Sequence, residues 1–203
     1  MKFEPDHIYH VYNQGNNKER IFLRPSHYEL FIKFTTTYIL PHADVIAWCL
    51  EPQFFRMQLK AKETCAILER QGGIFLDPLT NGFRKLLSTY SHVFNKRYYR
   101  TGALFKPKTK ARDLTKLQIQ NPSSSNEYYI NSFNYIHQNP LKQILVNNLS
   151  DWPYSSFRFY AGECEKDFCN KQLAELYCNY SQKNFLNSIH TSIPEKFLPY
   201  FEF

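Results

Sequence analysis

Seven basic residues and no acidic ones lie in the stretch KRYYRTGALFKPKTKAR, residues 96–112. The basic residues are Lys96, Arg97, Arg100, Lys106, Lys108, Lys110 and Arg112. The chain has 25 Lys and Arg against 18 Asp and Glu, so this stretch accounts for its whole formal charge of +7. Cationic side chains neutralise phosphates, and the interleaved rings of Tyr98, Tyr99 and Phe105 can stack on unpaired bases. The stretch therefore predicts a nucleic-acid contact, while a solvated, flexible loop is the alternative interpretation.

A β-hairpin is predicted over residues 44–60, DVIAWCLEPQFFRMQLK. Residues 45–50 are apolar, and Pro52 interrupts the run because proline fixes φ and cannot donate to a sheet ladder. The second strand alternates between two faces. One face carries Phe55, Met57 and Leu59, and the other carries Phe54, Arg56, Gln58 and Lys60. This pattern is typical of the middle of a sheet that buries one face and leaves the other open to a ligand.

The hairpin sequence CLEPQFFRMQL, residues 49–59, resembles the signature hairpin of the HUH single-tyrosine transposases, in particular the REP-associated tyrosine transposases. In that family the second strand carries His-hydrophobic-His at the positions held here by Phe54, Phe55 and Arg56. Residues i and i+2 of a strand share a face, so two such imidazoles can hold one divalent cation, Mg or Mn in the family. This chain lacks both histidines. The resemblance therefore implies that the family's cation is not bound here.

Three further blocks resemble the same family, in the right order. They are YHVYNQGNN, TYSHVFNKRYYRTGALF and the pair FNYIHQNPLKQILV and DWPYSSFRFYAG, so that the resemblance covers residues 7–162. Tyr135 matches the family's nucleophile, and Asn139 matches a residue that helps to hold the metal, a weak ligand alone. Their spacing of four places both on one face of a predicted helix, where they could address one phosphate. Without the motif, a tyrosine on an amphipathic helix indicates packing.

The resemblance implies a DNA-binding protein that acts on single-stranded or hairpin DNA in DNA transposition. In the family, the tyrosine attacks a phosphorus and forms a 5′-phosphotyrosine, while the cation polarises the phosphate. Arg56 and the seven basic residues are the expected DNA contacts, and metal-dependent cleavage is expected to be impaired or lost. Two alternatives stay open. One is an active transposase with a substitute metal ligand such as His10 or Glu51, and the other is a repurposed RNA- or protein-binding module without catalysis.

The fold implied by the resemblance is α+β, a ferredoxin-like or RRM-like antiparallel sheet with helices packed on one face and DNA received on the other. Residues 1–162 would form the transposase-like domain, and residues 163–203 a helical or irregular C-terminal extension. Capping boxes predict helix starts at Ser26 and at Ser124. A further helix is predicted over residues 78–95, weak helicity over residues 63–71, and a helix end at Asn139–Pro140.

The composition indicates a folded chain, since 43% of its residues are hydrophobic and 17% aromatic. No run approaches the roughly 20 apolar residues that a membrane span needs, and no apolar signal core follows the N-terminus, so a cytoplasmic protein is expected. Five cysteines without a Cys-x-x-Cys pair are typical of reduced thiols and disfavour zinc. The expected partner is DNA, with no membrane contact. Relatives occur as monomers and as dimers, so a homodimer stays an open expectation.

Overall fold

The predicted hairpin and first strand form the centre of one antiparallel sheet. This computed structural model describes residues 1–121 and 126–202. Its strands are β1 (Ile8–Gln14), β2 (Ala43–Glu51), β3 (Phe54–Ala61), β4 (Glu69–Gln71), β5 (Ile74–Leu76) and β6 (Lys110–Asp113). Four of them pair antiparallel in the order β2-β3-β1-β6, and β4 pairs with β5 in a separate hairpin. With one helix after β1 and another before β6, this is the βαββαβ order of a ferredoxin-like fold.

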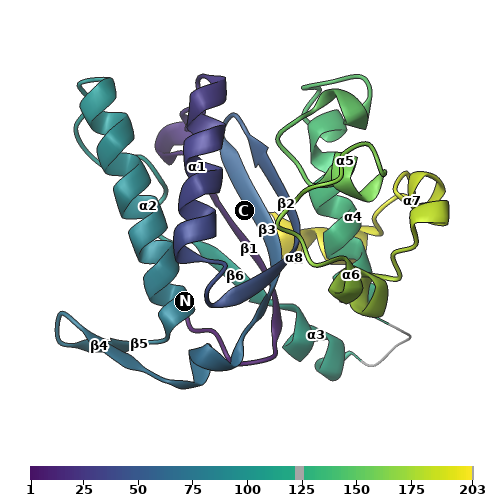
Figure 1. The fold of residues 1–203 in the computed structure, drawn as a ribbon, viewed down its shortest axis with the longest axis horizontal. Coiled ribbons are helices and arrows are strands. Elements are labelled where there is room, and N and C mark those ends of the chain that lie inside the picture. The colour runs from purple at the N-terminus through teal and green to yellow at the C-terminus, as the bar shows by residue number, and fades with distance from the viewer. Residues whose placement is uncertain (122–125, 203) are drawn as a thin grey trace.

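Helices lie on both sides of this sheet. They are α1 (Pro25–Tyr38), α2 (Pro78–Arg97), α3 (Leu114–Gln120), α4 (Glu127–Lys142), α5 (Phe157–Tyr160), α6 (Lys171–Cys178), α7 (Gln182–Ser188) and α8 (Leu198–Phe201). In Figure 1, α1 and α2 stand on one side of the strands, and α4 to α7 on the other. The predicted α+β fold is confirmed. The second face of the sheet is not open, however, because α4 and the C-terminal segment cover it.

The alternation of β3 sets which side chains face each layer. Phe55, Met57 and Leu59 are buried in the core beneath α1 and α2, where they join Phe31 and Phe83. This half of the prediction is confirmed, and the period of two explains it. The opposite face of β3 turns its polar residues toward α4. Those residues build the candidate site.

The two long helices differ in how they begin. Helix α1 starts at Pro25, whose missing N–H costs nothing at the first helical position. The Ser26 capping box is wrong, because no side chain caps α1; instead the Nδ1 atom of His27 accepts the Leu23 N–H at 3.1 Å. Ser124, where the second capping box was predicted, lies outside the described residues. Helix α2, which confirms the prediction over residues 78–95, is capped by the carboxylate of Asp77.

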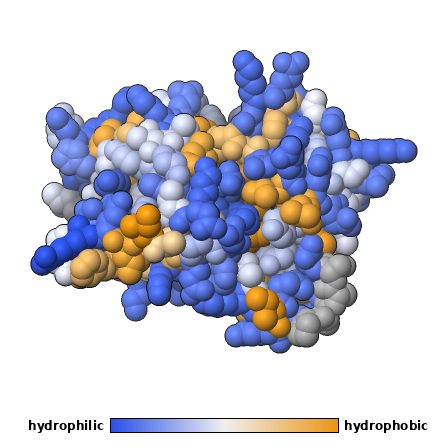
Figure 2. Space-filling view, turned by 60° about the horizontal axis from the view of Figure 1, so that its bottom comes forward, coloured by the Kyte–Doolittle hydropathy of each residue, from blue (hydrophilic) through white to orange (hydrophobic). Residues whose placement is uncertain are grey.

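Residues 63–71, expected to be weakly helical, form a single 3₁₀ turn followed by the first strand of the β4–β5 hairpin. Gly72 and Gly73 have φ values of +55° and +88°, and only such left-handed residues close a two-residue hairpin without strain. Apolar side chains reach the surface on and beside this hairpin, at Ile67, Leu68, Ile74 and Phe75. Figure 2 shows an apolar patch at the left of the view, where the hairpin lies.

Helix α4 runs past its predicted end at Asn139–Pro140 to Lys142. Pro140 is tolerated because the helix continues beyond it for only two residues, with the Gln143 N–H bonded to the Asn139 carbonyl. After Gly162 the chain forms α6, α7 and α8. Their buried side chains share an apolar core with α4 on the second face of the sheet.

All five cysteines are free thiols, as predicted. Across the described part of the chain, no helix combines the length and apolarity that a bilayer crossing would require.

Candidate functional site

Tyr135 lies where α4 crosses the polar face of β1 and β3. The antiparallel register places Tyr12 opposite Arg56 and His10 opposite Gln58, so these four side chains share the face beneath α4. The Arg56 guanidinium carbon is 5.3 Å from the centre of the Tyr135 ring, within cation–π range. Tyr135 is only 3% exposed. Sheet register and helix placement thus bring the predicted nucleophile to the predicted metal position.

Arg56 is buried rather than presented to solvent. It is 3% exposed, its Nε is 3.3 Å from Oε1 of buried Glu51, and its Nη1 donates to the Phe201 carbonyl at 3.1 Å. Its guanidinium also lies 5.0 Å from the centre of the Phe54 ring. The expectation that Arg56 stands on an open face is therefore wrong. A buried cation needs a compensating anion, and Glu51 supplies it.

The last described residues close the site, and we call residues 198–202 the C-terminal strap. The Phe201 ring stacks on His10, with centroids 5.2 Å apart and planes at 14°. The Tyr12 hydroxyl donates to the Glu202 carbonyl at 2.6 Å, and the Tyr135 hydroxyl donates to Glu202 Oε1 at 3.4 Å. Sequence reasoning missed the strap, because no motif or periodicity in this part of the chain signals a contact with β1 or α4.

The strap places a carboxylate among positive charges. The Lys142 Nζ lies 4.8 Å from the centre of the Tyr135 ring, and Arg112 stands opposite His10 on β6. Burial raises the pKa of Tyr135 to about 12, although Arg56 opposes this rise. The Tyr135 phenol therefore stays protonated at neutral pH. In this form it donates a hydrogen bond and is a poor nucleophile.

The residues at the family's metal position do not fit a divalent cation. Phe54 offers no donor atom, and Arg56 carries only N–H donors and a positive charge that repels a metal ion. The Asn139 side chain donates its amide N–H to the Tyr135 carbonyl at 2.9 Å, inside its own helix. His10 has its Nδ1 bonded to Ser132 Oγ at 2.9 Å and its buried Nε2 without a hydrogen-bond partner among the described residues, so it offers one donor atom at most. No step of a reaction at this site is therefore assigned to a metal.

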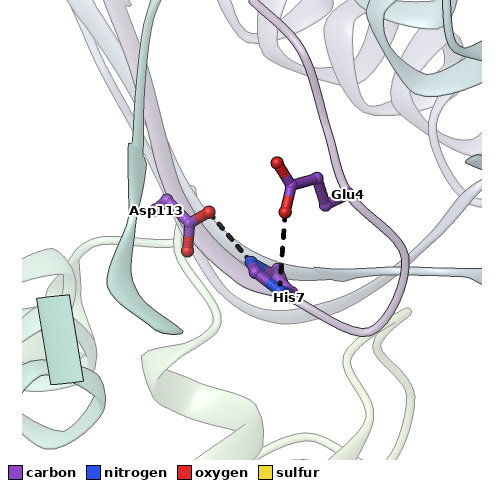
Figure 3. Close-up of side chains that lie close together, drawn as sticks. All are labelled: Glu4, His7 and Asp113. Atoms are coloured by element: carbon purple, nitrogen blue, oxygen red, sulfur yellow. Dashed lines mark hydrogen bonds and ion pairs between the residues drawn. The ribbon is translucent and has the colours of Figure 1, made fainter. Parts of the chain in front are cut away.

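A second cluster of ligand-type side chains joins Glu4, His7 and Asp113 (Figure 3). The two ring nitrogens of His7 face different carboxylates, Asp113 at 2.9 Å and Glu4 at 3.8 Å, so the ring bridges them. Lys116 adds a positive charge, with its Nζ 2.7 Å from Glu4 and 3.7 Å from Asp113. The cluster is an ion-pair network that fastens the N-terminal segment to β6 and α3.

The basic stretch follows the end of α2, a connecting loop and the edge strand β6. Lys96, Arg97 and Lys108 are exposed, and Lys110 is half-buried. No carboxylate of the described residues lies within 4.0 Å of these four cations. Arg100 differs, because it pairs with Glu19. The four cations remain available to a polyanion.

The three aromatic residues of this stretch have different environments. Phe105 is buried in the core, and the Tyr98 hydroxyl lies 3.2 Å from Nε2 of His27. Tyr99 is 97% exposed and has a left-handed backbone, with φ of +50°. Of the three rings, only that of Tyr99 stands free to stack on a base.

Two histidines near the site make the fold sensitive to acid. His10 and His137 are completely buried, and burial lowers the pKa of both, that of His137 to about 3. Both folded values lie below the unfolded value of about 6.5, so acid protonates the unfolded chain first. The contribution of the two neutral rings to folding stability is fully present above pH 6.5, and it is lost as the pH falls toward their folded pKa values. Each histidine contributes about 1.4 kcal/mol per pH unit, which predicts a loss of roughly 2–3 kcal/mol between pH 6 and pH 5.

Urea unfolding at several values in this pH window measures the slope. His137→Gln should reduce it by about half, and His190→Gln, at an exposed position, is the matched control. A slope that His137→Gln leaves unchanged would contradict the burial of that ring.

No protein-family model matches the chain. No curated protein matches it in sequence either. Among solved structures, the chain is similar to a REP-associated tyrosine transposase bound to a REP hairpin, with a TM-score of 0.57 and 14% sequence identity. The match covers 83% of this chain and 87% of that one. It shows that the two chains share a fold.

Proposed function

We propose that this protein binds single-stranded or hairpin-bearing DNA on a transposase-like fold, and that its strand-cleaving chemistry is impaired or lost. The solved structure of similar fold is bound to a REP hairpin, which supports DNA as the partner. The buried site and the basic stretch supply the physical argument for both parts of the proposal.

One observation carries the proposal: the site beside Tyr135 accepts an anionic oxygen. The Glu202 carboxylate receives the Tyr135 hydroxyl at 3.4 Å and interacts electrostatically with Lys142. The neighbouring guanidinium of Arg56 adds a second cation. A phosphate group of DNA has the same charge sign and the same acceptor chemistry as this carboxylate. We infer that a phosphate takes the place of Glu202 when DNA displaces the C-terminal strap.

The basic stretch gives the DNA a path to this site. It begins at the end of α2 and finishes on β6, where Arg112 stands opposite His10. Backbone phosphates would lie along Lys96, Arg97, Lys108 and Lys110. Stacking on the exposed ring of Tyr99 would hold an unpaired base beside them.

Cleavage requires more than this binding. A phenol whose pKa is raised to about 12 needs a metal or a base, and the residues at the metal position do not fit a metal. The carboxylate that Tyr135 contacts belongs to the strap that DNA would displace. Arg56 can still hold a phosphate electrostatically, so binding survives where attack on phosphorus does not.

The test is a denaturing-gel search for a covalent protein–DNA adduct, paired with a binding measurement on the same samples. The protein is incubated with manganese and a pool of hairpin-bearing single-stranded oligonucleotides. Tyr135→Phe and the double variant Phe54→His, Arg56→His are run beside it, and thermal unfolding checks that each variant is folded. We expect salt-sensitive binding by the unmodified protein and no adduct.

Each contrary outcome identifies a different alternative. An adduct that disappears in Tyr135→Phe would establish an active transposase with a substitute ligand. An adduct formed only by the double variant would support a surviving nucleophile at a decayed metal site. Absence of DNA binding would refute the proposed function. Tighter binding to RNA of the same sequence, or salt-insensitive binding to a protein, would favour the repurposed module.

A further inference from the structure

A small cavity opens between the start of α1 and the end of α2, away from the site of Tyr135. Its volume is about 120 Å³, which is room for roughly four water molecules. Apolar groups form most of its wall, and Ser26, His27 and Arg97 add polar groups to it. The lining residues are Ser26, His27, Leu30, Tyr90, Val93, Phe94 and Arg97.

The walls of this cavity are fixed in place. Tyr90 and Phe94 are 1% and 4% exposed, because they belong to the core between α2 and the sheet. Both ring nitrogens of His27 are engaged, Nδ1 by the Leu23 N–H and Nε2 by the Tyr98 hydroxyl. Val93 is 39% exposed and stands at the opening. A ligand would therefore meet a preformed apolar slot.

The surroundings of the cavity are strongly basic. Arg97 lines it, Lys96 precedes Arg97 on the same helix, and Arg24 is close enough to act electrostatically on His27. The exposed ring of Tyr99 follows Arg97 by two residues. An apolar slot ringed by cations suits a ligand that is flat and uncharged in one part and anionic in another.

We propose that this cavity takes one unstacked nucleobase of the bound strand, with Arg97 and Arg24 holding the phosphates on either side of it. The proposal rests on the proposed function, since it assigns a subsite to the same single strand. A nucleobase presents two apolar faces and is tethered to phosphates, which matches both the wall and the rim. The first basic residues of the stretch would then anchor a flipped base, and the stretch would lead the strand onward to β6.

The experiment compares two strands that differ only in their bases. Fluorescence anisotropy measures binding of an oligothymidylate of about 15 nucleotides and of an abasic strand of equal length. Val93→Trp fills the opening from α2, and Leu30→Trp fills the same cavity from α1, so one variant can decide if the other does not fold. Thr36→Trp, at an exposed position of α1 outside the cavity, is the control.

We expect the unmodified protein to prefer the oligothymidylate. Filling the cavity should weaken that binding roughly 5- to 150-fold, the range for loss of one stacked base, and leave the abasic strand unaffected. Equal loss on both strands, or no loss on either, would overturn the proposal. Equal affinity of the unmodified protein for both strands would overturn it while the proposed function stands, whereas no binding to either strand would overturn both.

Discussion

Replacing Arg56 by methionine is expected to lower the free energy of unfolding by about 3–5 kcal/mol. The substitution leaves the Glu51 carboxylate buried without its cation, and one of its oxygens already has no hydrogen-bond partner. It also removes the donor to the Phe201 carbonyl, which loosens the C-terminal strap. Urea denaturation measures the loss, and an unchanged m-value would show that the unfolded state is not involved.

A double-mutant cycle and a matched surface pair make this prediction specific. Glu51→Met combined with Arg56→Met should recover most of the loss, because no uncompensated charge remains buried. Arg158 forms a pair of the same chemistry with Glu163 at 3.4 Å, but its side chain is 44% exposed. Arg158→Met should therefore cost less than about 1 kcal/mol. An equal cost at both arginines would contradict the burial of the Arg56 pair.

Neutralising four cations of the basic stretch is expected to weaken binding of single-stranded DNA by about 10²–10³-fold at 0.1 M salt. The variant carries Lys96→Gln, Arg97→Gln, Lys108→Gln and Lys110→Gln. For a single strand, each phosphate contact adds about 0.7 to the slope of log affinity against log salt. Loss of four contacts should therefore reduce that slope by roughly 3, which a salt titration of anisotropy measures.

The control variant has the same change in net charge, but its substitutions lie outside the basic stretch. It carries Lys33→Gln, Lys166→Gln, Lys183→Gln and Lys196→Gln, all at exposed positions. If charge alone drew DNA to the protein, both variants would lose affinity equally. A large loss confined to the first variant locates the contact on the stretch, and a loss confined to the control would refute the proposed path.

The parts of the fold that sequence predicted well are those with strong local patterns. The bounds predicted for β3 and α2 are nearly correct. Burial of one face imposes an apolar period of two on a strand and of about 3.6 on a helix, and both patterns are visible in the sequence. The position of Tyr135 on α4 followed from a motif and helical spacing. The start of α1 was predicted from a Ser26 capping box that does not form, since the helix begins at Pro25, a residue suited to the first helical position.

The closure of the site could not be predicted in the same way. Phe201 lies far along the chain from His10 and Arg56, and its contacts with them depend on how α4, α6 and α7 stack between them. Local propensity carries no information about such contacts. The burial of Arg56 followed from them, since the face of β3 assumed to be open is covered by α4, whose packing on the sheet was not predicted, and by the C-terminal segment.

The cation of the Arg56–Glu51 pair differs from a bound metal ion in how it reaches the site. A coordinated ion can be removed by a chelator, exchanged for another metal, or missing when a cell is short of manganese or magnesium. A guanidinium is covalently part of the chain, so it is present in every molecule from the moment of synthesis. A ligand that binds beside Tyr135 therefore meets the Arg56 cation whatever the metal content of the cell.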